Sequence, residues 1–137
     1  MAPVADSPVS VLIVDDQVPF RRAAAAVVRV TGGFEVVGEA GSGEEAVDLA
    51  GSLGPQLVLM DINMGGINGI EATRRITSSL PEVVVVLLST YQAADLPADA
   101  ATSGAAAYVN KEEFGPEVLQ DLWEQRASGR LPSPGPP

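Results

Sequence analysis

Short apolar runs alternate along the chain with segments whose apolar residues recur every three or four positions. Short apolar runs between turn residues are typical of buried strands, and the wider spacing is typical of amphipathic helices. The runs predict strands at residues 9–14, 34–37, 56–60, 83–88 and 105–109.

Helical spacing fills most of the intervals between these predicted strands. It begins near Phe20 after the first strand, and Ser42 with Glu45 forms a capping box ahead of a second helix. Gly69 precedes a third helical pattern, and Pro116 suits the first position of the last helix, where its missing amide hydrogen costs nothing.

The segment 95–103 has a poor helical pattern. It is mostly alanine, and Leu96 is its single large apolar residue. Pro97 is tolerated only in the first turn of a helix, because proline has no amide hydrogen and its ring clashes with the preceding turn. We therefore expect a short, mobile fourth helix here.

Five strands that alternate with helices indicate an α/β fold. The strand at 83–88 is apolar at every position, which is typical of a parallel sheet covered on both faces. Right-handed crossovers place all strand carboxyl ends at one edge, and open α/β sheets bind their ligands at that edge.

Polar residues stand directly after four of the predicted strands. Each has an ordinary explanation when taken alone: Asp15 with Asp16 can cap a helix, and Asp61 can form a turn. Their meeting at one edge of the sheet favours a functional site instead. The residues at these strand ends are Asp15, Asp16, Asp61, Ser89, Thr90 and Lys111.

Three carboxylates at one edge need a counter-charge. Two carboxylates ~4 Å apart repel by about 4 kcal/mol at an effective dielectric constant near 20. Mg²⁺ prefers oxygen ligands and commonly binds one or two carboxylates together with water and phosphate oxygens. Asp61 is then equipped to attack phosphorus, with Mg²⁺ and Lys111 neutralising the charge on the transferred group.

Composition excludes several other kinds of chemistry. The 137 residues contain no histidine and no cysteine, so zinc sites, haem ligation, thiol catalysis and Ser–His–Asp catalysis have no ligands or bases here. With 18 acidic and 8 basic residues the net charge is −10, which argues against nucleic-acid binding by this domain.

The chain length fits one domain with flanking segments. We expect a disordered leader at 1–8, a folded domain at 9–127, and a proline-rich tail or truncated linker at 128–137. The first ten residues show no signal peptide, and the run at 83–88 is far shorter than the ~20 residues of a membrane helix. We therefore expect a cytoplasmic protein without membrane contact.

Four motifs resemble a known family. They are LIVDD at 12–16, MDINMGGINGIEATRRI at 60–76, VVLLSTY at 85–91 and AAYVNK at 106–111. Together they resemble the receiver domain of a two-component response regulator, most closely the regulators with a helix-turn-helix output domain. The resemblance covers residues 9–127 and implies a flavodoxin-like parallel sheet of order 2-1-3-4-5 with helices on both faces.

The resemblance also implies residue roles around Asp61, which matches the phosphoacceptor. Asp15 and Asp16 match the acidic pair that binds Mg²⁺ together with Asp61, and Asn63 matches the residue whose backbone carbonyl is a further ligand. Lys111 matches the lysine that pairs with the phosphoryl group. In this reading the protein catalyses its own phosphotransfer and dephosphorylation, and is not a turnover enzyme.

Ser89 and Tyr108 match the family's switch residues, although Tyr108 could equally be an ordinary core aromatic. The chain has no histidine, so the phosphodonor is expected to be the phosphohistidine of a partner histidine kinase. The resemblance implies that phosphorylation changes dimerisation or partner binding. A homodimer would form through the face of the fourth helix, the fifth strand and the fifth helix.

Two positions depart from the family pattern and are expected to modulate the site. Gly65 stands where the family usually has proline, which gives the loop beside Asp61 more backbone freedom. Thr90 is larger than the residue that the family usually has at this position, and it is expected to narrow access to Asp61. The main alternative function is a degenerate receiver that acts as a phosphorylation-independent interaction module.

Two further alternatives use a similar fold. An aspartate-nucleophile phosphatase needs a D-x-D motif after the first strand, where this chain has Asp15, Asp16 and Gln17. A flavin or nucleotide binder needs a phosphate-binding loop at the same place, and the acidic sequence there would repel phosphate.

Overall fold

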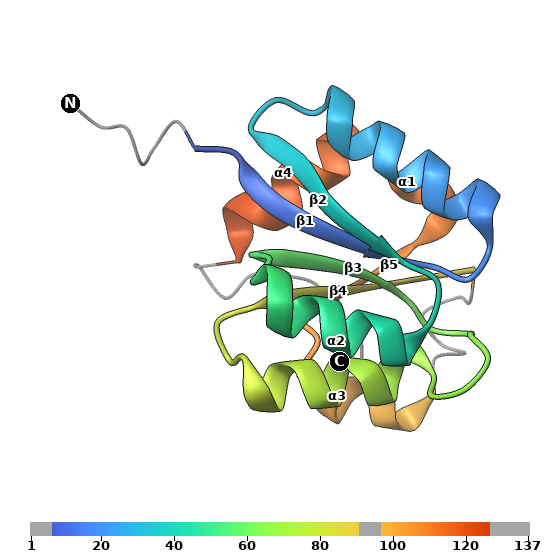
Figure 1. Ribbon diagram of the computed structural model, residues 1–137. Helices are drawn as coiled ribbons and strands as arrows, with labels where there is room; N and C mark the ends of the chain where they lie inside the picture. Colours follow the sequence, from blue (N-terminus) through green and yellow to red (C-terminus); the bar gives the residue numbers. More distant parts are fainter. Residues whose placement is uncertain (1–6, 91–96, 127–137) are drawn as a thin grey trace.

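The computed structural model describes residues 7–90 and 97–126. Its centre is a five-stranded parallel sheet of order β2-β1-β3-β4-β5 (Figure 1), which confirms the predicted fold class and strand order. The strands are β1 (Val9–Val14), β2 (Phe34–Ala40), β3 (Leu57–Asp61), β4 (Val84–Ser89) and β5 (Ala107–Asn110).

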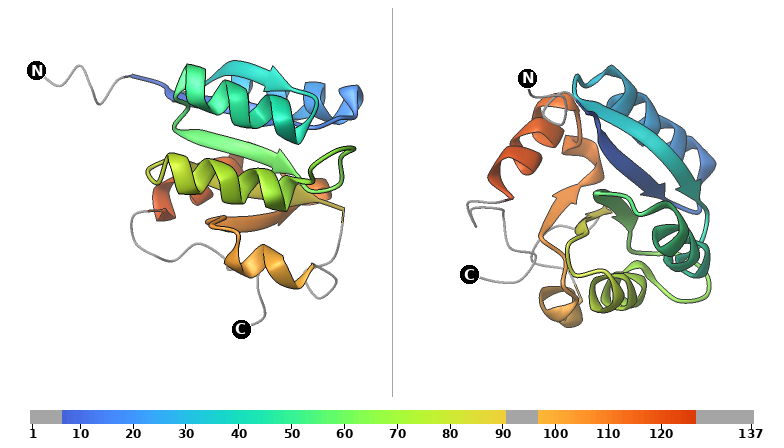
Figure 2. Two further views of the ribbon diagram at one scale, coloured as in Figure 1. Left: turned by 60° about the horizontal axis from the view of Figure 1, so that its bottom comes forward. Right: turned by 60° about the vertical axis from the view of Figure 1, so that its left-hand side comes forward.

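Helices cover both faces of this sheet. Helices α2 and α3 lie on one face, and α1 and α4 lie on the other (Figures 1 and 2). The α-helices are α1 (Val18–Val30), α2 (Gly43–Leu53), α3 (Gly69–Ser79) and α4 (Pro116–Gln125), and two 3₁₀ helices are η3 (Ala98–Thr102) and η4 (Lys111–Glu113).

The sheet separates two hydrophobic cores. Side chains alternate along a strand, so Leu12 and Val14 of β1 pack toward α2 and α3, whereas Val11 and Ile13 pack toward α1 and α4. Full burial of such an aliphatic side chain contributes roughly 1.5–3 kcal/mol. Both faces therefore hold the central strands in place, and the loops at the strand ends start from a fixed framework.

The predicted helix starts at Ser42 and Pro116 are present. The Ser42 hydroxyl accepts a hydrogen bond from the Glu45 backbone N–H at 3.1 Å. The Glu45 carboxylate reaches one residue further back than in a standard capping box and accepts from the Gly41 N–H at 2.8 Å. Pro116 opens α4, where the residue before it, Gly115, is the N-cap.

The other predicted strands match the structure to within two residues at each end, and two elements need a closer comparison. Strand β2 continues to Ala40, three residues past its predicted end, because residues 38–40 pair with residues 12–14 of β1. Gly38 and Glu39 interrupt the apolar pattern of the sequence, so the pattern did not predict this pairing.

A short helix is present within the segment 95–103, as predicted: it is a 3₁₀ helix that begins at Ala98, after the extended Pro97 (ψ 143°), and ends at Thr102. Residues 95 and 96 lie outside the described residues, and the predicted mobility stays a prediction.

The far end of the sheet, where β2 begins, carries a pair of aromatic rings. Phe34 at the start of β2 packs edge-to-face against Trp123 of α4, with ring centroids 6.4 Å apart. The guanidinium group of Arg126 lies 3.7 Å from the centroid of the Trp123 ring.

Among the residues that the structure describes, no helix is long and apolar enough to cross a membrane. The predicted leader and tail fall almost entirely outside the described ranges.

Candidate functional site

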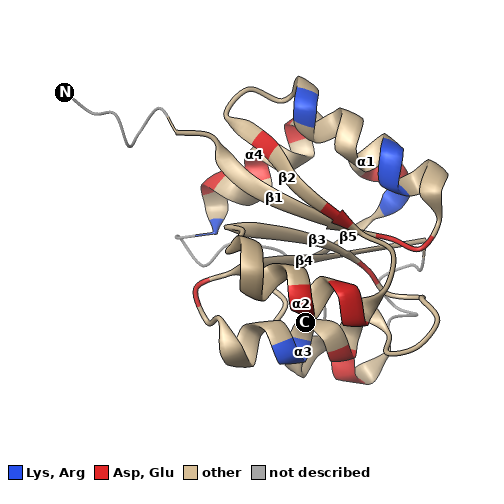
Figure 3. Ribbon diagram, in the orientation of Figure 1, with Lys and Arg blue, Asp and Glu red and all other residues tan. Residues whose placement is uncertain are grey.

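The carboxyl ends of β1, β3 and β5 bring together the acidic and basic residues predicted from the sequence. Asp61 is the last residue of β3, Asp15 follows β1, and Lys111 follows β5 directly. Asp15 and Asp61 are each 5% exposed, whereas Asp16 is exposed to solvent. Figure 3 shows acidic positions at the ends of β1 and β3.

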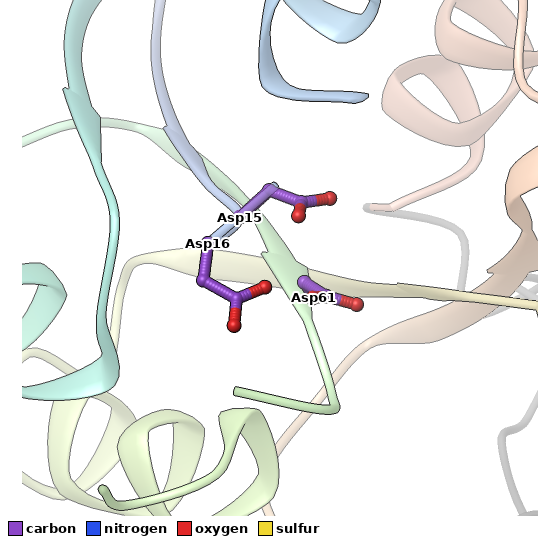
Figure 4. A group of neighbouring side chains, drawn as sticks. All are labelled: Asp15, Asp16 and Asp61. Carbon is purple, nitrogen blue, oxygen red and sulfur yellow. The ribbon is translucent and has the colours of Figure 1, made fainter. Parts of the chain in front are cut away.

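Three carboxylates form a compact cluster. Asp15, Asp16 and Asp61 each offer one oxygen, and these oxygens all lie within 4.8 Å of one another (Figure 4). Carboxylate oxygens are the donors that Mg²⁺ prefers, and an exposed ligand such as Asp16 leaves room for the waters that Mg²⁺ keeps. The donor set therefore fits a hard divalent cation.

Lys111 links two members of this cluster. Its Nζ lies 2.7 Å from Asp15 Oδ2 and 3.2 Å from Asp61 Oδ1, and the Lys111 side chain is only 9% exposed. The Phe20 ring lies beneath the ammonium group, at 4.2 Å from Nζ to the ring centroid. One lysine offsets one of three carboxylate charges, so the cluster remains two charges negative.

Asp61 is a carboxylate of this cluster whose ionised form is destabilised by its surroundings. Burial, followed by the nearby charge of Asp15, raises the pKa of the Asp61 carboxyl from 3.8 to about 6, while Lys111 acts in the opposite direction. A buried carboxylate near other carboxylates is destabilised as an anion. A cation beside Asp61 would relieve that cost, which agrees with the donor chemistry of the cluster.

Arg21 supports the backbone of Asp15, and sequence reasoning missed it. Arg21 Nη1 donates to the Asp15 carbonyl oxygen at 2.8 Å, and Arg21 Nε donates to Glu39 Oε1 at 3.1 Å. Asp15 Oδ1 accepts from the Gln17 N–H at 2.8 Å, which closes a local turn. Helical spacing was the sequence signal that could have pointed to Arg21, because Arg21 falls on the same face of α1 as the buried Val28.

The loop from Asp61 to α3 carries the next predicted ligand, Asn63, which is exposed. The loop closes tightly: a Cβ atom on Gly69 would lie 1.9 Å from the Asp61 carbonyl oxygen, so only glycine fits there. The Gly69 N–H donates to the Ile62 carbonyl oxygen at 2.8 Å. Sequence reasoning placed Gly69 at the start of a helix but missed this contact with the strand.

The predicted switch residues lie on β4 and β5. Ser89 ends β4 and is 2% exposed, and the Tyr108 hydroxyl donates to the Ser89 carbonyl oxygen at 3.2 Å. The Tyr108 ring is half-buried and packs against the core on the side of α2 and α3, and burial raises the pKa of its hydroxyl. Both interpretations of Tyr108, as switch or core residue, fit this position. Thr90 is exposed beyond Ser89.

Comparisons with known proteins identify the family of this chain. Residues 11–123 match the family model of the response regulator receiver domain. The chain is 36% identical over 126 residues to the response regulator GacA of Pseudomonas aeruginosa, which covers 92% of this chain and 59% of that protein.

Solved structures of response regulators are also similar to this chain. A LuxR-family two-component response regulator from Aurantimonas has 29% identity and a TM-score of 0.80, covering 92% of this chain and 89% of that chain. The CheX-CheY-BeF3-Mg+2 complex from Borrelia burgdorferi includes a chain with 28% identity and a TM-score of 0.76, covering 86% of this chain and 89% of that chain.

This chain therefore belongs to the response regulator receiver domain family of two-component systems. Receiver domains of these systems act in signalling together with histidine kinases. Its relatives include transcriptional regulators and LuxR-family proteins. The chain spans less than three fifths of the length of the curated relatives GacA and LnrK, the latter from Bacillus subtilis.

Proposed function

We propose that this domain is a phosphorylation-dependent switch whose phosphoacceptor is Asp61. The observation that carries the proposal is the position of Lys111 Nζ between two buried carboxylates, 2.7 Å from Asp15 and 3.2 Å from Asp61. A buried lysine beside a carboxylate nucleophile is suited to stabilise a phosphoryl group as it transfers. The proposed phosphodonor is the phosphohistidine of a partner histidine kinase, as membership of the receiver-domain family suggests, and it must come from another chain because this chain has no histidine.

In the proposed reaction an oxygen of Asp61 attacks the phosphorus atom of a phosphohistidine. The new O–P bond forms as the P–N bond breaks, and the imidazole leaves with the electron pair and takes up a proton. Lys111 pairs with the negative oxygens of the transferred group. Asp15, Asp16, Asp61 and the backbone carbonyl of Asn63 would hold Mg²⁺, which would supply further charge neutralisation when bound.

Ser89 and Tyr108 are proposed to transmit the change. The Ser89 hydroxyl turns toward the phosphoryl group, and Tyr108, whose hydroxyl donates to the Ser89 carbonyl, moves inward with it. The readout is a change in dimerisation or partner binding, a shift between populations of one fold. The proposed homodimer surface is the face of the fourth helix, the fifth strand and the fifth helix of the prediction, which correspond to η3, β5 and α4. Gly65 and Thr90 are proposed to modulate access to Asp61.

The domain is proposed to catalyse its own phosphotransfer and dephosphorylation, and not to turn over other substrates. We propose that it is cytoplasmic, that its boundaries are residues 9–127, and that DNA contact belongs to an output domain such as the LuxR-family relatives imply. The proposed absence of direct DNA binding rests on the net charge of −10.

The decisive experiment is phosphorylation in vitro with a small donor. Incubation with Mg²⁺ and acetyl phosphate or phosphoramidate should add one phosphoryl group by intact mass, because both donors carry a transferable phosphoryl group. Asp61→Asn should abolish the adduct. Asp48→Asn, at an exposed carboxylate of α2, should retain it and serves as the matched control.

The second candidate is the degenerate receiver, and it rests on Gly65 in place of the family's usual proline. The structure offers no steric reason for glycine at this position, since a Cβ there would meet no atom within 4 Å. Absence of an adduct in the wild-type protein with every donor would favour this candidate over the phosphorylation switch.

A further inference from the structure

The loop between β3 and α3 combines two adjacent glycines with the candidate metal ligand Asn63. Gly65 has open space around it, whereas Gly66 has a φ of +77°, a conformation that side-chain-bearing residues rarely adopt. Two glycines in sequence lose more conformational entropy on folding than other residues would. A loop of this composition needs external contacts if it is to hold Asn63 in one place.

Helix α2 supplies such a contact through Glu44 in its first turn. Glu44 Oε2 accepts a hydrogen bond from the Ile67 backbone N–H at 3.1 Å, although 23 positions separate the two residues. A Cβ on Gly66 would lie 2.7 Å and 2.8 Å from the two Glu44 carboxylate oxygens. The carboxylate therefore lies directly against the backbone of the loop, at the residue of this loop that has a positive φ.

A second contact joins the same two segments. A Cβ on Gly43 would lie 2.6 Å from Ile67 Cγ1 and 2.8 Å from the Ile67 carbonyl oxygen. The absence of a side chain at position 43 lets the first turn of α2 approach the loop this closely. The hydrogen bond from Ile67 also lowers the pKa of the exposed Glu44 carboxyl, so Glu44 accepts this bond as an anion at neutral pH.

We infer that Glu44 is a positioning residue for the phosphoacceptor site, because it fixes the loop that carries Asn63 next to Asp61. This inference rests on the proposed function for the identity of the site. Glu44 itself does not touch the reacting atoms, and it acts through Ile67 and Gly66. The loop thereby gains from α2 the rigidity that its glycines lack.

An alternative role for Glu44 is general stabilisation of α2, as acidic residues in the first turn interact favourably with the helix dipole. Glu45 stands in the same turn and bonds the Gly41 N–H within its own segment, so it provides that stabilisation without touching the loop. The two roles are therefore separable by a measurement at the metal site and another at Ile67.

The test is calorimetric titration of Mg²⁺ into the wild-type protein and into Glu44→Ala, Glu44→Gln and Asp48→Ala. Glu44→Ala should weaken Mg²⁺ binding by about tenfold, the lower end of the range for residues that orient metal ligands. Asp48→Ala removes the same charge from an exposed position of the same helix and should change binding by less than twofold. Glu44→Gln keeps an acceptor oxygen and should recover most of the loss.

Hydrogen exchange of the Ile67 amide is the second readout and does not depend on phosphorylation. Its protection should fall in Glu44→Ala and stay at the wild-type level in Asp48→Ala. Adding Gly65→Ala to Glu44→Ala should restore part of the Mg²⁺ affinity, because alanine stiffens the loop at a position with room for a Cβ.

Equal Mg²⁺ affinity in Glu44→Ala and Asp48→Ala would overturn the inference, as would equal losses in Glu44→Gln and Glu44→Ala with Ile67 still protected. Failure of the proposed function gives a different pattern. In that case the wild-type protein forms no phosphoryl adduct, while Glu44→Ala still weakens Mg²⁺ binding relative to its control.

Discussion

At the residue scale, Asp61 makes its own contribution to the way the stability of the domain varies with pH. The pKa of its carboxyl is raised to about 6 in the fold, from 3.8. Between these values the folded state binds more protons than the unfolded state, so the free energy of unfolding falls as pH rises through this window. Above pH 6 the full cost of the buried charge is present. Keeping the Asp61 carboxyl ionised therefore lowers the free energy of unfolding of the domain.

Asp61→Asn should make the metal-free protein more stable at pH 7, by on the order of 2 kcal/mol, because the amide carries no charge to desolvate. The gain should disappear near pH 4, where the wild-type carboxyl is itself protonated. Urea unfolding in the presence of EDTA at both pH values measures this difference. Asp48→Asn controls for loss of one exposed charge, and an equal gain in both variants would contradict the prediction.

At the element scale, the sequence predicted strands and helix starts well where the cause is local. The Ser42 cap and the apolar run of β4 depend on neighbouring residues alone. The predicted end of β2 was wrong because its cause is not local. The pairing of residues 38–40 with β1 extends β2 past its apolar run.

A second prediction at this scale concerns the connection between β3 and α3. Gly69→Ala should destabilise the domain by about 1–3 kcal/mol, because its Cβ would overlap the Asp61 carbonyl oxygen and α3 must move. Gly65→Ala, in the same loop and with open space around it, should be neutral or slightly stabilising. Thermal unfolding of the two variants tests the contrast, and a loss at Gly65 as large as that at Gly69 would refute it.

At the scale of the whole molecule, the meeting of Asp15, Asp61 and Lys111 at one edge followed from chain topology, whereas the sheet order came from the resemblance to receiver domains. The parallel topology alone determines which residues share that edge. The contacts of Arg21 and Glu44 could not be predicted in this way. They depend on how α1 and α2 sit against neighbouring loops, and no periodic pattern in the sequence records that packing.

Mg²⁺ should stabilise the whole domain, since a ligand that binds only the folded state raises the free energy of unfolding. At ten times its dissociation constant the gain is about 1.4 kcal/mol, which corresponds to a rise in Tm of several degrees for a domain of this size. Excess EDTA should reverse the rise. Asp16→Asn should reduce it, and an undiminished rise in that variant would place the ion elsewhere.

The pair of Phe34 and Trp123 gives the molecule an optical reporter far from its chemistry. Trp123 is the single tryptophan of the chain, and it packs at the end of the sheet where β2 begins, whereas Asp61 stands where β3 ends. The fluorescence of Trp123 should therefore not respond to events confined to the edge of the sheet that carries Asp15, Asp16 and Asp61. A change in its emission on adding Mg²⁺ or acetyl phosphate would mean that the rearrangement had crossed the full length of the sheet.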